Sequence, residues 1–117
     1  FESLHPGSSQ VSAFVNCAAK QGKFLNAYDL VFLMQDDMPE DLENDYLVKL
    51  GSDIGLSLDD LWNCLSSTET ALEVTEDFDI GVSYGIRGTP SFFVNGELVE
   101  GSVSFEAWQS FIDDFLN

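Results

Sequence analysis

The sequence predicts an α/β fold in which a mainly helical region is followed by a β-hairpin and a C-terminal helix. Two observations lead to this fold class. Two short runs of strand-forming residues, 91–94 and 97–100, are separated only by Asn95 and Gly96. In the segments on either side, apolar residues recur at intervals of three and four, as one buried face of a helix requires.

The dipeptide Asn95-Gly96 is the strongest local signal in the chain. Both residues readily adopt the positive φ angles of a type I′ turn, whose twist matches that of right-handed strands. We therefore expect a two-residue hairpin. Pro90 suits the start of its first strand, because proline has no N–H to donate to a ladder. A cis or a trans Thr89–Pro90 bond is compatible with this position, and trans is the commoner state of such bonds.

Five helices are expected before the hairpin and one after it. The second is more apolar than the first and is expected to be more central, Pro39 is expected to open the third, and serines are expected to cap the first, fourth and last. A strand tail is expected at residues 1–4. The helices are expected from Ser8 or Ser9 to about Gly22, from Lys23 to about Gln35, from Pro39 to about Ile54, from Ser57 to about Leu65, from Ser67 or Thr68 to about Gly85, and from Ser104 onward.

The composition describes one small and strongly acidic domain. The chain has 117 residues, with 21 acidic against four basic side chains and a formal net charge of -17. This charge argues against nucleic acid and anionic lipid as partners, because both are polyanions. No apolar run is long enough for a membrane span, so membrane insertion is not expected. Because the chain begins at Phe1 without a methionine, we expect a fragment of a longer protein.

Neither a cofactor nor a metal site is expected. The most acidic stretch, residues 36–45, lacks the ligand spacing and the central glycine of an EF-hand calcium loop. The two cysteines, Cys17 and Cys64, lie too far apart for a CxxC motif, and the single histidine, His5, has no cysteine near it in sequence. Redox or metal chemistry at these cysteines is therefore not favoured.

Cys17 and Cys64 occupy matching places in two expected helices, with apolar residues at the same offsets from each thiol. If the two helices pack together, the thiols are able to form a disulfide. Two separately buried free cysteines explain the same pattern equally well. The residues alone leave both possibilities open.

With the order of elements assembled, the chain resembles the DsbA-like thiol-disulfide oxidoreductases, which are thioredoxin folds with an inserted helical domain. Two segments carry the resemblance: CAAKQGKF at residues 17–24 and YGIRGTPSFFVNG at residues 84–96. The resemblance implies a single partial thioredoxin-like domain over residues 1–117. Residues 8–84 would then be the helical insertion, and residues 85–117 the C-terminal hairpin and helix of the thioredoxin fold.

The resemblance also assigns roles to particular residues. It implies a cis Pro90, a substrate-facing loop at Arg87, Gly88, Thr89 and Pro90, and a structural disulfide between Cys17 and Cys64. The catalytic CxxC of the family lies in an N-terminal unit for which this chain has no residues, so no catalytic residue is expected here.

The function implied by the resemblance is disulfide formation or isomerisation in exported proteins, outside the cytoplasm. The expected partners are unfolded or reduced proteins and a redox partner protein, and the isolated chain is expected to be inactive and to self-associate through an unpaired strand edge. Two alternatives remain open. One is a relative of the cytosolic kappa-class glutathione transferases, and the other is a thioredoxin-like binding or chaperone module without catalysis.

Overall fold

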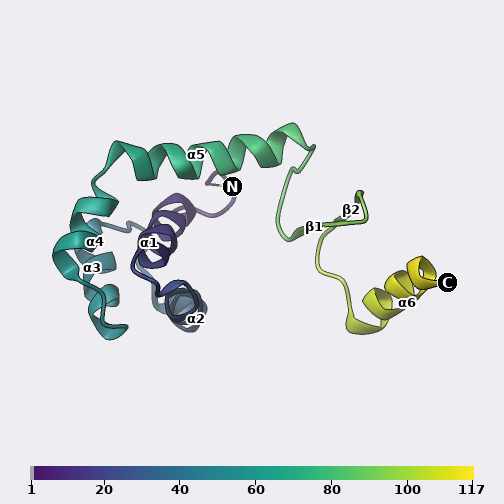
Figure 1. The fold of residues 1–117 in the computed structure, drawn as a ribbon, viewed down its shortest axis with the longest axis horizontal. Helices are drawn as coiled ribbons and strands as arrows, with labels where there is room; N and C mark the ends of the chain where they lie inside the picture. Colours follow the sequence, from purple (N-terminus) through teal and green to yellow (C-terminus); the bar gives the residue numbers. More distant parts are fainter. Residues whose placement is uncertain (1) are drawn as a thin grey trace. The chain divides into compact units, whose positions relative to one another are not determined.

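The computed structural model describes residues 2–117 and divides the chain into two compact units, residues 1–81 and 82–117 (Figure 1). The first unit is helical. The boundary between the units falls within the longest helix, α5, and the second unit holds the hairpin and the last helix. The elements are α1 (Ser8–Lys20), α2 (Phe24–Met34), the 3-10 turn η1 (Gln35–Asp37), α3 (Asn44–Asp53), α4 (Leu58–Leu65), α5 (Thr68–Ser83), β1 (Ser91–Val94), β2 (Glu97–Glu100) and α6 (Phe105–Leu116).

The start of α1 is capped by a residue that lies outside the helix. The carboxylate of Glu2 accepts hydrogen bonds from the backbone N–H of Gly7 at 2.7 Å, from that of Ser9 at 2.9 Å and from the hydroxyl of Ser8 at 3.1 Å. Two backbone donors that a helix start leaves without intrahelical partners are thus satisfied by one side chain. The expected serine cap is therefore wrong. The expected strand tail at residues 1–4 is also wrong where it can be checked, because residues 2–4 form a turn and Phe1 lies outside the described residues.

Glu2 consequently favours its charged form. The backbone N–H groups of Ser9 and Gly7 lower the pKa of the Glu2 carboxyl from its ordinary value of 4.5 to about 2, because these hydrogen bonds stabilise the carboxylate. The negative charge also lies at the positive end of the α1 dipole. Both effects tie the N-terminal turn to the helix.

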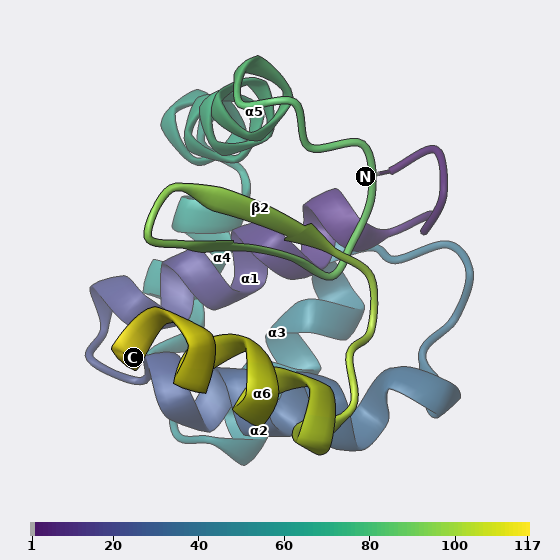
Figure 2. The same ribbon diagram turned by 90° about the vertical axis from the view of Figure 1, so that its right-hand side faces the viewer.

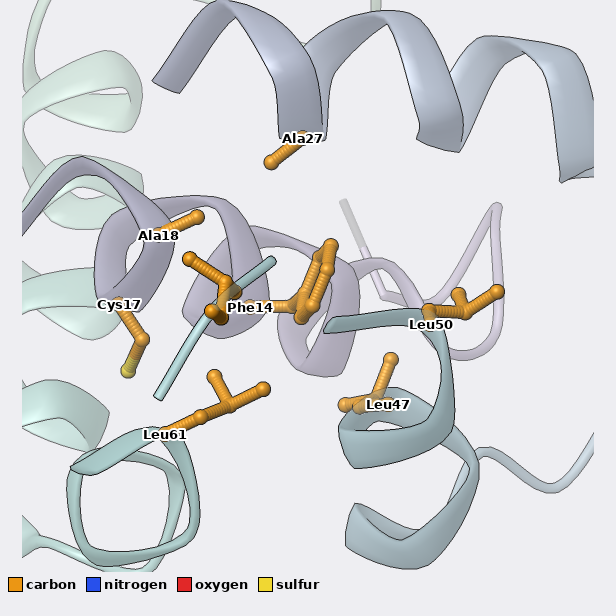
Figure 3. Packing of buried hydrophobic residues seen from close by; sticks show 8 residues of the cluster. Phe14, Cys17, Ala18, Ala27, Leu47, Leu50 and Leu61 are labelled. Carbon is orange, nitrogen blue, oxygen red and sulfur yellow. The ribbon is translucent and has the colours of Figure 1, made fainter. Parts of the chain in front are cut away.

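The core of the first unit lies among α1, α2, α3 and α4 (Figure 3). Its members are small or aliphatic residues, apart from the aromatic Phe14. Phe14 of α1 and Leu61 of α4, the two helices that carry the cysteines, are both fully buried. The buried apolar residues are Phe14, Cys17, Ala18, Ala27, Leu47, Leu50, Leu56 and Leu61. Helix α1 contributes three of these residues, more than any other helix, and is therefore the central helix of the unit.

Gly51 allows α3 and α4 to approach closely. A Cβ atom at this position would overlap the Cδ2 of Leu61 and would lie 3.3 Å from the Cδ1 of Leu56. Both leucines are buried in the core. The contact between the two helices therefore depends on the absence of a side chain at residue 51.

The expected central position of α2 is not observed. Ala27 is its only buried residue, whereas Leu25 is 70% and Leu33 is 77% exposed. Phe24, Tyr28 and Phe32 form a row of neighbouring rings along one side of α2, with centroids 6.2 and 4.8 Å apart. Helical spacing explains this row, because residues four apart lie on the same face.

Pro39 does not open a helix. Residues 38–43 are irregular, and α3 begins only at Asn44, after the extended N-cap Glu43. Residues 38–43 of the acidic stretch thus connect η1 to α3, and their acidic side chains remain exposed to water. Ser57 and Ser104, in contrast, cap α4 and α6 as expected, accepting hydrogen bonds from Asp60 N–H at 3.5 Å and Ala107 N–H at 3.2 Å.

The second unit contains the expected hairpin (Figure 2). The strands β1 and β2 are antiparallel, and Phe92 pairs with Val99 and Phe93 with Leu98. Asn95 has φ 50° and Gly96 has φ 87°, as a type I′ turn requires. The hydrogen bond from Gly101 N–H to the Pro90 carbonyl, at 2.8 Å, extends the pairing beyond the strands.

Helix α6 contacts the hairpin through one pair of rings. The indole of Trp108 meets the ring of Phe92 edge to face, with centroids 5.0 Å apart, and Phe111 and Phe115 continue the row along the helix. The ring of Phe93 contacts Tyr84 at 5.9 Å. Since adjacent residues of a strand point to opposite faces, these contacts cover part of each face of β1.

We predict that Gly51→Ala destabilises the protein by about 1–2 kcal/mol. Overpacking against Leu61 costs roughly 1–3 kcal/mol, and the higher helix propensity of alanine returns up to about 1 kcal/mol. Urea unfolding followed by circular dichroism measures the change. The exposed Asp53→Ala on the same helix serves as the control and should change stability little. A Gly51→Ala variant as stable as the wild type would contradict the close approach of α3 and α4.

We predict that Glu2→Gln lowers stability only where Glu2 is ionised. A group whose pKa is lowered on folding stabilises the protein above its unfolded pKa, and this contribution disappears as the pH falls through the folded pKa. The loss should be about 0.5–1 kcal/mol above pH 5, in the lower part of the capping range because the carboxylate is exposed. It should decline between pH 4.5 and 2. Thermal melts of both proteins at several pH values test this, and a difference independent of pH would contradict it.

Candidate functional site

A disulfide joins α1 to α4 in the first unit. The Sγ atoms of Cys17 and Cys64 are 2.07 Å apart, the Cα atoms are 5.9 Å apart, and the two residues are separated by 47 positions in sequence. Cys17 is buried and Cys64 is partly buried. The residue three positions before each cysteine, Phe14 or Leu61, is fully buried. Because residues three apart lie on the same side of a helix, both cysteines are directed toward the same core.

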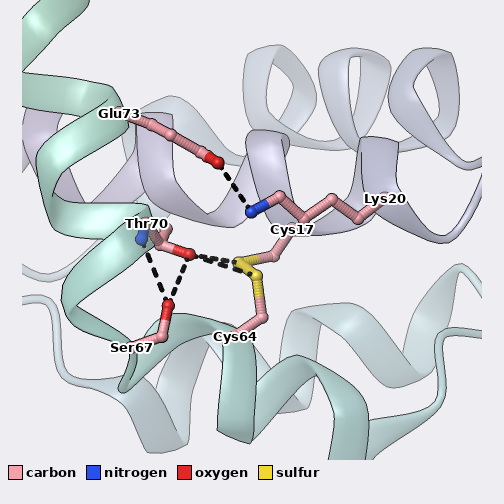
Figure 4. Close-up of polar contacts among 6 residues, drawn as sticks. All are labelled: Cys17, Lys20, Cys64, Ser67, Thr70 and Glu73. Atoms are coloured by element: carbon pink, nitrogen blue, oxygen red, sulfur yellow. Dashed lines mark hydrogen bonds and ion pairs between the residues drawn. A yellow bond between two sulfur atoms is a disulfide. The ribbon is translucent and has the colours of Figure 1, made fainter.

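The disulfide is in contact with α5 through Thr70 (Figure 4). The hydroxyl oxygen of Thr70 lies 3.4 Å from Cys64 Sγ and 3.9 Å from Cys17 Sγ. Because the sulfur atoms of a disulfide carry no hydrogen, the Thr70 hydroxyl is the donor. Ser67 completes the arrangement, since its hydroxyl donates to Thr70 Oγ1 at 2.9 Å and accepts from the Thr70 N–H at 3.1 Å.

Thr70 is the only buried residue of α5. A buried hydroxyl without a partner would cost about 1–3 kcal/mol, and here the hydroxyl has both a donor and acceptors. Ser67 also acts as the N-cap of α5 through its bond to the Thr70 N–H. The start of α5 is therefore fixed at the disulfide by polar contacts rather than by apolar packing.

One ion pair connects α5 to α1 beside this arrangement. Lys20 Nζ lies 2.8 Å from Glu73 Oε1, and the hydrogen bond and negative charge of Glu73 raise the pKa of Lys20 (Figure 4). The pair is exposed to solvent, so its contribution to stability is small. It adds a second polar contact between α5 and α1, beside the disulfide.

The loop before β1, in the second unit, holds the expected substrate-facing residues. The Thr89–Pro90 peptide bond is cis, and Arg87, Thr89 and Pro90 are exposed. The loop is held from both sides: Ser91 Oγ donates to the Gly88 carbonyl at 2.6 Å, and the Pro90 carbonyl accepts from Gly101 N–H. An ion pair of 3.4 Å joins Arg87 to Glu100.

Thr89 lies between these fixed residues with its backbone exposed. Within residues 2–117, neither its N–H nor its carbonyl has a hydrogen-bond partner. The outer edge of β1, which follows at once, is likewise unpaired in the described part of the chain, because the sheet contains only β1 and β2. The loop and the strand edge together offer backbone donors and acceptors to an extended segment.

The structure thus brings Cys17 and Cys64 together and gathers residues 87–90 in one loop, in separate units. Sequence reasoning gave Ser67 only as a possible start of the helix and missed Thr70, Lys20 and Glu73. Ser67 carries a detectable signal, since serine is a preferred N-cap residue. The ion pair has no such signal, because its two residues are 53 positions apart.

No potential metal centre is found among the described residues: no three or more histidine, cysteine or acidic side chains come together there. None of the described helices combines the length and the apolar character needed to cross a bilayer.

Comparison with known proteins shows the family of the chain. A family model described as thioredoxin matches residues 1–114. The chain belongs to the thioredoxin family. Its six α-helices and two-stranded sheet in the described residues are thus a thioredoxin-like domain, here with a disulfide joining Cys17 and Cys64. No solved structure matched the chain.

Three curated relatives are Na(+)/H(+) antiporters. NhaA 3 of Salinispora tropica and NhaA 1 of Salinispora arenicola are each 30% identical over 105 residues, which cover 89% of this chain. NhaA of Herminiimonas arsenicoxydans is 31% identical over 98 residues, or 84% of this chain. In each comparison the chain spans only 15% of the length of the antiporter.

We predict that removal of the disulfide strongly destabilises the first unit. Replacing both cysteines by alanine should cost about 4 kcal/mol, within a range of 2–5, because the cross-link closes a long loop in the unfolded chain. Guanidinium unfolding of the double variant and the wild type measures the loss. Intact mass after alkylation of unreduced and reduced protein provides the control. Two alkylated thiols in freshly purified, unreduced protein would contradict the bond.

Proposed function

We propose that this chain is the substrate-binding part of a protein thiol-disulfide oxidoreductase of the DsbA-like kind, which acts on exported proteins outside the cytoplasm. The observation that carries the proposal is the Thr89–Pro90 loop. It is fixed at Gly88 and Pro90, exposed at Thr89, and continuous with an unpaired strand edge. Such an edge binds an extended peptide by adding it as a strand.

The substrate class follows from what the loop offers. Backbone hydrogen bonds do not select side chains, so an extended segment of an unfolded or reduced protein fits better than a folded surface. The acidic side chains, with a net charge of -17, favour basic clients during the encounter. Arg87, paired with Glu100, places one cation beside the loop.

The exchanging cysteines would have to come from outside residues 1–117. A disulfide is transferred when a substrate thiolate attacks one sulfur of a reactive pair and a second thiolate then resolves the mixed disulfide. Cys17 and Cys64 are not suited to this exchange, because Cys17 is buried and the bond forms part of the core. The isolated chain should therefore bind unfolded protein and should not oxidise it.

The disulfide also bears on the kappa-class glutathione transferase alternative. Stable disulfides are typical of proteins that work outside the reducing cytosol, so the Cys17–Cys64 bond supports the exported assignment. Ion transport is not proposed for this chain, because the antiporter relatives match it over only 15% of their length.

The unpaired edge of β1 also supports self-association of the isolated chain. Phe92 is 41% and Phe93 is 47% exposed, on opposite faces of the strand. We propose that two copies pair along this edge when no client is bound, so that clients and a second copy compete for it.

Binding of an unfolded protein tests the proposal at the level of single atoms. We expect carboxymethylated ribonuclease A, which stays unfolded, to perturb the amides of residues 88–94 in NMR titrations of the chain. Thr89→Pro removes the N–H of residue 89 and should weaken binding about five- to tenfold, the value of one or two hydrogen bonds. Thr89→Val keeps the N–H and should bind as the wild type does.

The catalytic part requires the natural full-length protein. It should accelerate the oxidative refolding of reduced ribonuclease A, whereas residues 1–117 alone should not. Equal activity of the Thr89→Pro and wild-type full-length proteins would contradict the role of the loop. Client binding without any oxidation or isomerisation by the full-length protein would instead favour the chaperone alternative.

A further inference from the structure

A pocket of about 280 Å³ lies in the first unit, beside the disulfide-linked core. Helices α1, α3, α4 and α5 all contribute to its walls. Leu47, which is buried, lines the pocket together with residues that include Ala13 of α1 and Ala71 of α5. Its described lining residues all belong to the first unit, whereas Thr89 belongs to the second.

None of the described residues that line the pocket is charged, although the chain has 21 acidic side chains. Its apolar residues are Ala13, Leu47, Leu65, Ala71 and Val74, and the others, which include Gln10 and Asn44, are polar and uncharged. A charged ligand would lose hydration on entry and find no opposite charge, which is costly. The lining therefore selects neutral molecules.

The walls are connected to one another by bonds that fix the shape of the pocket. The Cys17–Cys64 disulfide joins α1 to α4, and Thr70 holds α5 against it. The Lys20–Glu73 pair joins α5 to α1, and the side-chain amide of Asn44 donates to Ser66 Oγ, just after α4, at 3.5 Å. Small-molecule sites are usually largely formed before the ligand binds, and this set of contacts provides such a site.

The size and the polar rim define the ligand further. An apolar cavity of about 150 Å³ accommodates benzene, so this pocket has room for one ring and a few more atoms. At the rim, the side-chain amide of Gln10 and the Oδ1 of Asn44 have no hydrogen-bond partner among the described residues. They offer both a donor and an acceptor to a hydroxyl group on the ligand.

We propose that this pocket binds a small neutral molecule that combines one aromatic ring with a hydroxyl group. The ring lies against Ala13, Leu47 and Val74, and the hydroxyl is directed to Gln10 and Asn44. Two effects disfavour an anion of the same size: the uncharged lining offers it no counter-charge, and the negative charge of the whole domain repels it.

Benzyl alcohol is the probe for the test, and benzoate and benzylamine are charged probes of similar size. In NMR titrations at 0.5 M salt, which screens the net charge, we expect saturable shifts of the Ala13, Ala71 and Val74 signals with benzyl alcohol. Benzoate and benzylamine should bind at least tenfold more weakly, because neither finds a counter-charge in the lining.

Filling the pocket provides the matched variants. Ala71→Leu on α5 and Ala13→Leu on α1 should each weaken benzyl alcohol binding at least tenfold, and leucine is a good helix former at both positions. Ala107→Leu, on the exposed side of α6, adds the same atoms elsewhere and should leave the affinity unchanged. If Ala71→Leu does not fold, Ala13→Leu still tests whether filling the pocket weakens binding.

Three outcomes would overturn the proposal. The first is shifts that do not saturate with benzyl alcohol, and the second is binding that persists in a folded Ala71→Leu or Ala13→Leu protein. The third is equal affinity for benzyl alcohol and benzoate at 0.5 M salt, since this would remove the argument from the uncharged lining.

Discussion

The bond between Cys17 and Cys64 is the constraint on which the helical unit depends. It joins α1 to α4 close in sequence to two fully buried core residues, Phe14 and Leu61, and Thr70 of α5 contacts both of its sulfur atoms. Among the described residues of this unit only eight apolar ones are buried, a small core to set against the conformational entropy of the chain. A cross-link that restricts the unfolded state adds stability without requiring a larger core.

The hairpin unit is organised differently, by local chemistry and ring contacts. All the buried residues found in the structure precede Val82, so β1, β2 and α6 have no fully buried side chain. The turn at Asn95-Gly96, the Ser104 cap and the row from Phe92 through Trp108 to Phe115 maintain its elements. A two-stranded sheet of this kind is marginal alone. The open edge that makes it marginal is the same edge that we propose for client binding.

Particular residues show how much could be predicted from the sequence and why the rest could not. The hairpin and the Ser57 and Ser104 caps were predictable because they depend on neighbours within three residues. The disulfide required knowledge of a family, since matched helix offsets did not exclude free thiols. Glu2 was missed because its carboxylate reaches across a turn whose path the sequence does not specify. The apolar α2 was misplaced because hydrophobicity reports a preference for burial, not the presence of a partner surface.

The strong negative charge of the chain explains which polar side chains are buried and which remain at the surface. With 21 acidic side chains, each carboxylate placed inside the unit would need a partner, and the chain has only four basic residues to provide one. The polar group that is buried is therefore a hydroxyl, Thr70, satisfied by Ser67 and the disulfide. The acidic residues remain at the surface, where their mutual repulsion opposes compaction. The repulsion is strongest at low ionic strength, where unscreened charges act over the longest distances. The contribution of the Cys17–Cys64 bond does not depend on salt, so its share of the stability matters most under those conditions.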